Sequence, residues 1–495
     1  MSGPMNGAAN GSADGAANPA AGPAKQTAPG TMTAWEDLVS TALVGTERRP
    51  PQGVPAGADP AVELLERAAV QTVRARAGQR PRAGEPLEAA PREEQPVVSR
   101  AAADRLARIL GGERPRVLAE WLRTAAGRGY RLAPHLLPEL LDHAARDRSI
   151  RPHAGILAGR RGRWLAALNP AWDFLLEEVT AARPRPEVWE LGTCGDRRAY
   201  LAALRAADPG AARELLAAAW EKETPEDRAA FLEVLGEGLS LDDEPFLEAA
   251  LDDRRREVRH EAADLLTRLP DSRLGRRMAE RVARRFAVAR GKLEVDAPFE
   301  CDAAMERDGI RAKPPRGTGE RGWWLQQLVA RTPLGVWGDL LGRPPRELVR
   351  TKIVDWEREV MAGWVRAAVL QGDPEWAREL FASDPLADLL AVLPREEQET
   401  VAAGFVRRHG LDGQLIMVLG GAAAPWGPEL ARAVLHKILE LSGTQPWNLG
   451  ELTKLAGERV DPALYGLAER LSPEPPIQEV AALLRFRDDM LKELS

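Results

Sequence analysis

Cysteine is scarce in this chain of 495 residues, which contains only Cys194 and Cys301. Two thiols are too few for a disulfide framework or a four-thiolate zinc site, and they favour a reducing compartment. We therefore expect the protein in the cytoplasm.

A large excess of charge of one sign is also missing. Lys and Arg total 68 against 74 Asp and Glu, which gives a formal net charge of −6. This balance lacks the strongly basic composition of a dedicated nucleic-acid coat protein, although local basic patches remain compatible with it. Lysine supplies only 8 of the 68 basic residues, a bias typical of a GC-rich genome that carries no functional weight.

Long apolar runs are absent from the sequence. A membrane-spanning helix needs about 18 consecutive apolar residues, and the nearest stretch, Leu415 to Trp426, is interrupted by glycines. The N-terminus has no basic segment followed by an apolar one, as a signal peptide would. We expect neither export nor membrane insertion.

The first 33 residues contain almost no large apolar side chains, so we expect a disordered tail rich in Ala, Gly and Pro. The pair Thr33 and Glu36 forms a capping-box pattern, which predicts a helix start at Thr33. Apolar residues at helical spacing from Trp35 to Leu43 predict one face of this helix, and residues 62–69 predict a second helix.

From residue 99 onward the helical period is nearly continuous, and Ala and Leu far outnumber β-branched and aromatic residues. This pattern predicts an all-α protein. A recurring device, a capping residue followed by Pro at the first helical position, marks the expected helix starts. It occurs at Asn169-Pro170, Asp208-Pro209, Thr224-Pro225, Asp373-Pro374, Asp384-Pro385 and Asp461-Pro462.

The segment from Asp252 to Leu266 resembles the second helix of a HEAT repeat, with Asp, then Val-Arg, then Ala-Ala, then Leu. Short helices that bury their apolar stripes only against neighbours are typical of a solenoid. We expect a HEAT-like α-solenoid of antiparallel helix pairs. The expected regions are a tail (1–33), an N-terminal helical region (34–190), HEAT-like repeats (191–290), an irregular charged insertion (291–322) and C-terminal helical repeats (323–495).

Three blocks of sequence carry a resemblance to a known family. They are TAWEDLVSTALVGTERRPP at 33–51, LAGRRGRWLAALNPAWDF at 157–174 and DAAMERDGIRAKPPRGTGERGWWLQQLVARTPLGVW at 302–337. From about residue 34 to its end, the chain resembles a bacterial family of unknown function whose members are encoded beside MoxR-type AAA+ ATPases, von Willebrand A-type proteins and SWIM zinc-finger proteins. The resemblance implies a role in an ATPase-linked assembly and supplies no catalytic residues.

The insertion at 291–322 changes from acidic to basic along its length, so it is a candidate for binding. A solvated charged loop is the plain alternative. Carboxylates and cations converging in one pocket, Asp302, Asp308 and Arg311 above all, would instead favour a metal- or phosphate-dependent activity. The candidate partner or anion contacts are Asp302, Asp308, Arg311, Lys313, Arg316, Arg321, Trp323 and Trp337.

Glycines 317, 319 and 322 form a GxGxxG pattern, but Lys313-Pro-Pro-Arg316 stands where a dinucleotide site requires a buried strand. The pattern therefore favours a loop-to-helix junction, with anion binding at the helix start as the alternative.

Two arginine clusters form a candidate basic surface that could contact phosphates. In the second cluster the arginines recur at helical spacing and would line one ridge, although an acidic stretch at 240–253 adjoins it. The plain interpretation is that these arginines and the neighbouring acidic residues lie on solvated helix faces whose charges balance. The residues are Arg160, Arg161, Arg163, Arg273, Arg277, Arg281 and Arg284.

Tryptophan is frequent, with 14 residues against three tyrosines. Trp beside Leu, Phe, Val or Ala at helical intervals predicts a packing anchor, whereas Trp beside Gly or Pro is a candidate partner contact. We expect most of Trp35, Trp172, Trp220, Trp364 and Trp376 to be anchors, with one or two exposed, and the candidate contacts are Trp337, Trp426 and Trp447.

Catalytic signatures such as GxSxG, Walker A and HExxH do not occur, and we expect no catalytic residues, cofactor or metal. The interpretation that the sequence favours is a non-enzymatic scaffold that binds another protein through the concave surface of the solenoid, a MoxR-type ATPase or its von Willebrand A-type companion being the family-implied partner. The alternative is a nucleic-acid-binding protein or base-excising enzyme on the same scaffold.

Overall fold

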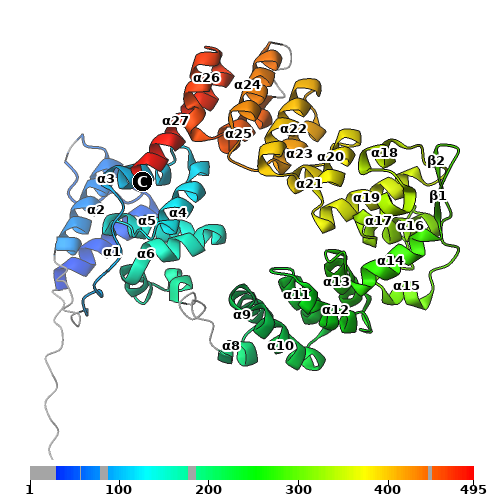
Figure 1. Ribbon diagram of the computed structural model, residues 1–495. Coiled ribbons are helices and arrows are strands. Elements are labelled where there is room, and N and C mark those ends of the chain that lie inside the picture. The colour runs from blue at the N-terminus through cyan, green and yellow to red at the C-terminus, as the bar shows by residue number, and fades with distance from the viewer. Residues whose placement is uncertain (1–28, 56, 78–86, 177–185, 444–448) are drawn as a thin grey trace, which may run out of the picture. The chain divides into compact units, whose positions relative to one another are not determined.

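The computed structural model describes residues 29–55, 57–77, 87–176, 186–443 and 449–495 (Figure 1). Of the tail expected at 1–33, residues 1–28 lie outside this part of the chain. Contacts divide the chain into two compact units, Met1–Ala89 and Ala90–Ser495.

The first unit contains two helices, α1 (Pro29–Val44) and α2 (Pro60–Ala77). Helix α1 begins four residues before the capping box that was expected to start it, so the prediction of a start at Thr33 was wrong. The two helices contact each other, but they bury few large apolar side chains.

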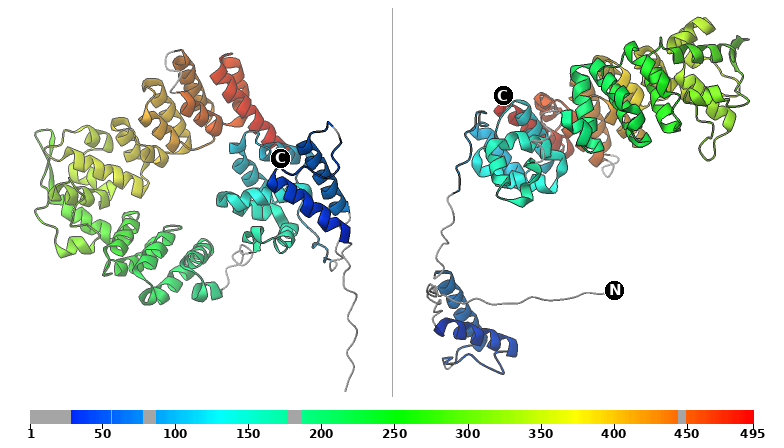
Figure 2. Two further views of the ribbon diagram at one scale, coloured as in Figure 1. Left: turned by 180° about the vertical axis from the view of Figure 1, so that it is seen from behind. Right: turned by 90° about the horizontal axis from the view of Figure 1, so that it is seen from below.

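The second unit begins with four helices that share a core with the end of the chain. They are α3 (Arg100–Leu110), α4 (Leu118–Gly127), α5 (Leu137–Arg146) and α6 (Arg151–Ala166). Phe486, Met490 and Leu494 join this core from the last helix, α27 (Pro475–Glu493). Helix α27 also belongs to the core of the C-terminal helices through Ile477, Val480, Ala481 and Leu484. It therefore packs on both the first and the last helices of this unit (Figure 2).

The middle of the second unit is a run of short helices that share a second core. They are α8 (Pro186–Leu191), α9 (Cys194–Ala207), α10 (Pro209–Ala219), α11 (Pro225–Leu235), α12 (Glu244–Ala250), α13 (Arg256–Thr267), α14 (Arg273–Ala283), α15 (Ala303–Arg307) and α16 (Glu320–Arg331).

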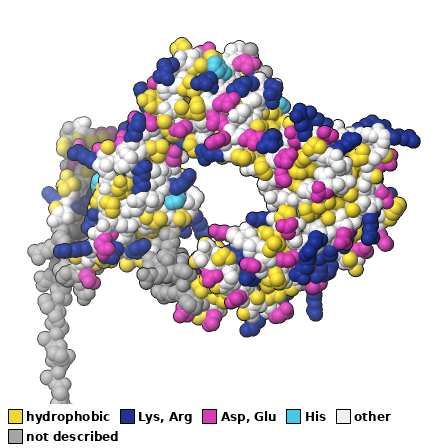
Figure 3. Space-filling view, in the orientation of Figure 1, with side chains coloured by type: hydrophobic (Ala, Val, Ile, Leu, Met, Phe, Trp, Pro, Cys, Tyr) yellow, Lys and Arg dark blue, Asp and Glu magenta, His cyan; other side chains and the backbone are white. Residues whose placement is uncertain are grey.

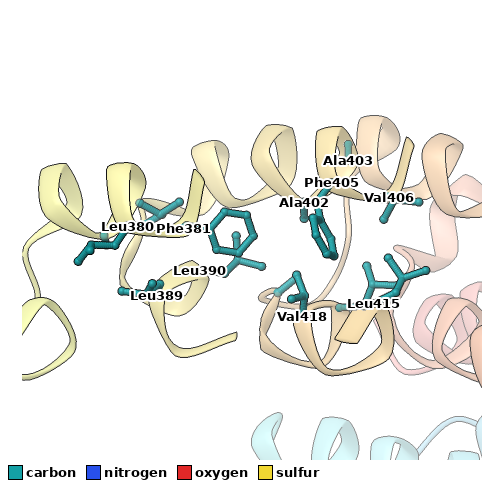
Figure 4. Close-up of a cluster of buried hydrophobic side chains, with 14 of the residues drawn as sticks. Leu380, Phe381, Leu389, Leu390, Ala402, Ala403, Phe405, Val406, Leu415 and Val418 are labelled. Carbon is teal, nitrogen blue, oxygen red and sulfur yellow. The ribbon is translucent and has the colours of Figure 1, made fainter. Parts of the chain in front are cut away.

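The C-terminal helices form a third core, in which α16 and α14 also take part. They are α17 (Leu334–Leu341), α18 (Pro345–Arg350), α19 (Glu357–Gln371), α20 (Pro374–Ser383), α21 (Ala387–Val392), α22 (Arg395–Arg408), α23 (Gly413–Gly421), α24 (Pro428–Ser442), α25 (Leu449–Arg459) and α26 (Tyr465–Leu471). Helices mainly contact those one, two or three places away in the chain, as in α11 with α13, α22 with α24 and α25 with α27. Side chains from α20, α21, α22 and α23 meet in one such interface (Figure 4).

The helix starts follow the expected caps at most positions. Asn169, Asp208, Asp373 and Asp461 each accept a hydrogen bond from a backbone N–H of the following turn, and so does Thr224. The prediction at Asp384 was wrong, because Asp384 ends α20 and α21 begins three residues later. The described residues are mostly helical, which confirms the all-α class in its main feature.

One antiparallel hairpin departs from the all-α expectation. Strands β1 (Phe286–Ala289) and β2 (Lys292–Val295) pair with Ala289 opposite Lys292. Arg290 and Gly291 have φ values of 52° and 76°, the left-handed backbone that a two-residue hairpin turn requires. Leu293 also exchanges backbone hydrogen bonds with Lys352 and Val354. The segment 291–322, expected to be irregular, thus contains β2, α15 and the start of α16.

No helix among the described residues has both the length and the apolar character that crossing a bilayer requires.

Candidate functional site

Asp308, one of the predicted contacts, lies buried at the end of α15 with 1% of its surface exposed. Arg277 of α14 donates from Nη2 to Asp308 Oδ1 at 2.8 Å, and Arg281 donates from Nη1 to Oδ2 at 2.5 Å. Arg277 also pairs with the buried Glu248 of α12 at 3.0 Å. Burial alone would lower the pKa of Arg277, but the hydrogen bonds to Asp308 and Glu248 outweigh it and raise that pKa. Two of the predicted ridge arginines therefore neutralise a predicted acidic site.

The rest of the predicted ridge is not a free basic surface either. Arg273 pairs with Glu244 at 3.4 Å, whereas Arg284 is exposed at the end of α14. On the face seen in Figure 3, basic and acidic side chains are interspersed, and basic ones gather in the region of α12 and α13.

A second ionic cluster, which the sequence did not indicate, joins α13 to α16. Arg331 donates from Nη1 to Asp264 Oδ1 at 2.6 Å and contacts His260 Nδ1 at 2.7 Å, while Arg366 pairs with Asp264 at 2.8 Å. Burial and the Arg331 charge lower the pKa of His260 to about 4, so the imidazole is neutral at neutral pH. The i,i+4 spacing of His260 and Asp264 was visible in the sequence, but their cationic partners lie 67 and 102 residues beyond Asp264.

A pocket of about 490 Å³ brings three of the predicted contacts together. Arg311, Lys313 and Trp323 line it, and Arg256 and Arg259 of α13 complete its basic lining. Asp302 does not line this pocket. Its carboxylate accepts a hydrogen bond from the Met305 N–H and caps α15. Since Asp308 faces the arginines of α14, the convergence of Asp302, Asp308 and Arg311 that a metal- or phosphate-dependent activity would have required is not observed.

Three other predicted contacts lie apart from this pocket. Arg321 donates to the carbonyls of Ala297 and Pro298 and stacks on Phe299 with its Cζ 4.1 Å from the ring centroid. Arg316 is exposed in the loop before α16. Trp337 is fully buried in α17, where it packs edge-on against Trp364.

Burial corrects several of the tryptophan predictions. Trp337 and Trp426 are buried and cannot serve as surface contacts, and Trp447 lies outside the described residues. Trp172, Trp364 and Trp376 are buried anchors and Trp220 is half-buried, whereas Trp35 is 46% exposed, so most but not all of this set are anchors, as expected.

The glycines of the GxGxxG pattern serve the junction into α16. Gly317 has a φ of 84°, and Gly319 is the residue that precedes the helix. At Gly322 an added Cβ would lie 3.1 Å from Glu359 Cγ and 3.3 Å from Trp356. Close packing against the start of α19 therefore explains why this position is a glycine. The residues directly before the first glycine, Lys313-Pro-Pro-Arg316, form no strand.

The other predicted basic cluster lies on α6. Arg160 pairs with Glu94 at 2.9 Å, and the backbone N–H of Arg161 donates to Glu93 at 2.7 Å, whereas Arg163 is exposed. Gly159 has a φ of 60°, and the Glu93 carboxylate occupies the space of a Cβ there. Part of the GRRGR sequence is therefore explained by the docking of residues 92–94.

A larger pocket of about 1130 Å³ lies where α4 faces α25 and α27. Its lining mixes apolar residues with both charge signs, and Arg487 pairs there with Glu120 at 2.7 Å. In the described part of the chain, no three His, Cys, Asp or Glu side chains gather as a ligand set for a metal ion.

The fold and these sites define a mostly helical protein whose central arginines are largely committed to internal ion pairs. The chain belongs to a family of unknown function, DUF5691, whose model matches residues 37–494. Neither the curated proteins nor the solved structures include a match to this chain.

Proposed function

We propose that this protein is a HEAT-like helical scaffold that binds another protein, without catalysis of its own. The observation that carries the proposal is the exposed apolar surface of α1 and α2. On α1, Trp35, Val39 and Leu43 recur every four residues and are 46%, 40% and 83% exposed. On α2, Val62, Leu65, Ala69 and Val73 form a similar stripe, in which Leu65 is 69% exposed.

Such stripes normally face a core, because burying a large apolar side chain contributes about 1.5–3 kcal/mol. Here α2 contains no buried residue at all. Exposed apolar stripes on a folded protein are typical of an interaction site, and an amphipathic helix is a common element for binding a helical or grooved partner. We name these two exposed stripes together, with Trp35, Val39, Leu43, Val62 and Leu65, the apolar face.

The packing order of the second unit supports the scaffold part of the proposal. In α13, the positions that resemble a HEAT repeat, among them Val258, Ala262 and Leu265, are buried against α11 and α12. A stack of short helices that contact mainly their chain neighbours fits a solenoid, whose extended surface suits a protein partner.

The ion pairs of the ridge count against the nucleic-acid alternative. Phosphate binding requires cations that are free to replace counterions, whereas Arg277 and Arg281 are held by Asp308. The partner that the family resemblance suggests is a cytoplasmic MoxR-type ATPase or its von Willebrand A-type companion.

The test is an affinity pull-down of the full chain from native cytoplasm after nuclease treatment. Wild type is compared with Leu43→Glu/Leu65→Glu, which places two charges on the apolar face. We expect wild type to recover a protein in stoichiometric amount and the double variant to lose it, while the unfolding midpoint of the purified chain is unchanged. The matched control is Met417→Glu on α23, an apolar position that is 66% exposed against 69% for Leu65, which should retain the partner.

Two results would contradict the proposal. If both variants recover the partner equally, the apolar face is not the binding surface. If wild type retains only nucleic acid, and higher salt removes it, the protein is a nucleic-acid binder.

A further inference from the structure

The pocket of about 490 Å³ beside α13 has an unbalanced charge. Four cationic side chains line it, against the two carboxylates of Glu257 and Glu306. Arg256 is paired with Glu257 at 2.6 Å. The other three cations are Arg259, Arg311 and Lys313.

None of these three cations forms an ion pair with a carboxylate in the part of the chain that the structure describes, although the charge of Arg311 acts on nearby Glu257. The guanidinium of Arg259 donates to the backbone carbonyls of Asp253 and Glu306 at 2.9 and 3.2 Å, which fixes its position without neutralising its charge. The side chains of Arg311 and Lys313 have neither a hydrogen bond nor an ion pair among the described residues and are exposed. The pocket therefore holds a net excess of positive charge, with four cations against two carboxylates.

Side chains of α16 hold the backbone beneath these two cations. Gln327 accepts from the Arg311 N–H at 2.8 Å, and the Arg311 carbonyl accepts from Trp323 Nε1 at 2.8 Å. The next carbonyl, that of Ala312, accepts from Trp324 Nε1 at 2.8 Å. Three side chains thus fix a loop whose own cationic side chains remain available, which is the preorganisation that a binding site needs.

We propose that this pocket binds the phosphate group of a small ligand. A phosphate carries close to two negative charges at neutral pH and three acceptor oxygens, so it matches a cluster of Arg and Lys donors better than a single carboxylate does. The volume falls within the range of small-molecule sites. Glu257 and Glu306 border the pocket, and the arginines around Asp308 are internally paired, so a long polyanion would meet repelling charge on leaving the pocket.

The phosphate can be that of free inorganic phosphate or pyrophosphate, or that of a nucleotide, and the indole of Trp323 in the lining offers an apolar surface to a base. The experiment is calorimetric titration of the full chain with pyrophosphate and, separately, with ADP. We expect saturable binding of pyrophosphate that weakens as ionic strength rises. Tighter binding of ADP would assign the site to a nucleotide, and equal or weaker binding would assign it to free phosphate.

The variant Arg311→Gln/Lys313→Gln should weaken binding by about tenfold or more, because it removes two charge-assisted donors. Arg316→Gln is the matched control, because Arg316 is an exposed arginine of the same loop that does not line the pocket. Its affinity should equal that of wild type, and both variants should keep the wild-type unfolding midpoint. The proposal is overturned if neither pyrophosphate nor ADP binds wild type saturably, or if Arg316→Gln weakens binding as much as the double variant. It is independent of the protein-binding proposal, which concerns the apolar face.

Discussion

Arg277 and Asp308 are 31 residues apart in the sequence and form one ion pair, with Arg277 Nη2 2.8 Å from Asp308 Oδ1. The pair ties α14 to the segment that follows the β-hairpin. Each residue, taken from the sequence, was a candidate for binding an external ligand. Their pairing gives both a structural role.

Replacing Asp308 with Asn should therefore destabilise the protein without affecting partner recovery. Removing one member of a buried ion pair costs about 3 kcal/mol or more, because the remaining charges lose their compensation. Urea unfolding of Asp308→Asn and of the exposed control Glu300→Gln measures this. Equal midpoints for the two variants would contradict the structural role.

Breaking the Arg205–Asp243 pair should destabilise the protein more than breaking the Arg277–Asp308 pair. Both side chains are fully buried, with Nη2 2.7 Å from Oδ2, and Arg205 also donates to the carbonyls of Leu235 and Glu237. Burial alone would raise the pKa of Asp243, but the hydrogen bonds from Arg205 outweigh it and lower that pKa. We expect Asp243→Asn to lower the free energy of unfolding by about 3–5 kcal/mol. The neighbouring Asp242→Asn, at an exposed position, should have little effect in the same urea titration.

His260 should make stability depend on pH. Its pKa is about 4 in the folded protein against an ordinary 6.5, so between these values the unfolded chain binds the proton and the folded one does not. The free energy of unfolding therefore falls as the pH falls through this window, by about 2 kcal/mol from pH 7 to pH 5 for this group.

The control is His260→Gln, which still offers Arg331 an acceptor but does not titrate. Urea unfolding at both pH values should show a smaller loss for this variant than for wild type. Identical losses would mean that His260 is not the responsible group.

The two cysteines should react slowly with iodoacetamide in the folded protein. Burial, together with the charges of Glu306 and Asp302, raises the pKa of Cys301 to about 11 from an ordinary 9, so its thiolate fraction is about a hundredfold below that of a free thiol. A hydrogen bond to Asp227 raises the pKa of the exposed Cys194. Mass spectrometry should find Cys301 modified last, and Asp227→Asn should accelerate modification of Cys194 alone. Rapid labelling of Cys301 in the folded chain would contradict this.

The features of the fold that could be predicted from the sequence are those set by neighbouring residues, such as the helix caps. The caps at Asp208 and Asp373 act within one helical turn, so their effect is visible in adjacent residues. The hairpin at 286–295 was missed because its strands are only four residues long and its turn pairs an Arg with a Gly. Asp384 carries the same Asp-Pro signal as Asp373, yet it ends a helix.

The candidate site was less predictable because it depends on contacts between distant residues. Arg311, Lys313 and Trp323 were selected together and do share a pocket. Trp337 was misjudged, since neighbouring glycines suggested a loop whereas packing against Phe286 and Trp364 buries it. The spacing of Arg277 and Arg281 was correct, but nothing local indicated that Asp308 would neutralise them.

Hydrogen–deuterium exchange of α1 and α2 tests the central claim most directly. Exchange is compared between the purified chain and the complex recovered from cytoplasm, with α13 as an internal reference for the folded scaffold. If a partner covers the apolar face, amides of both helices should exchange rapidly in the free chain and become protected in the complex, while α13 is unchanged. Identical exchange of α1 and α2 in the two states would contradict the proposal that this face binds a partner protein.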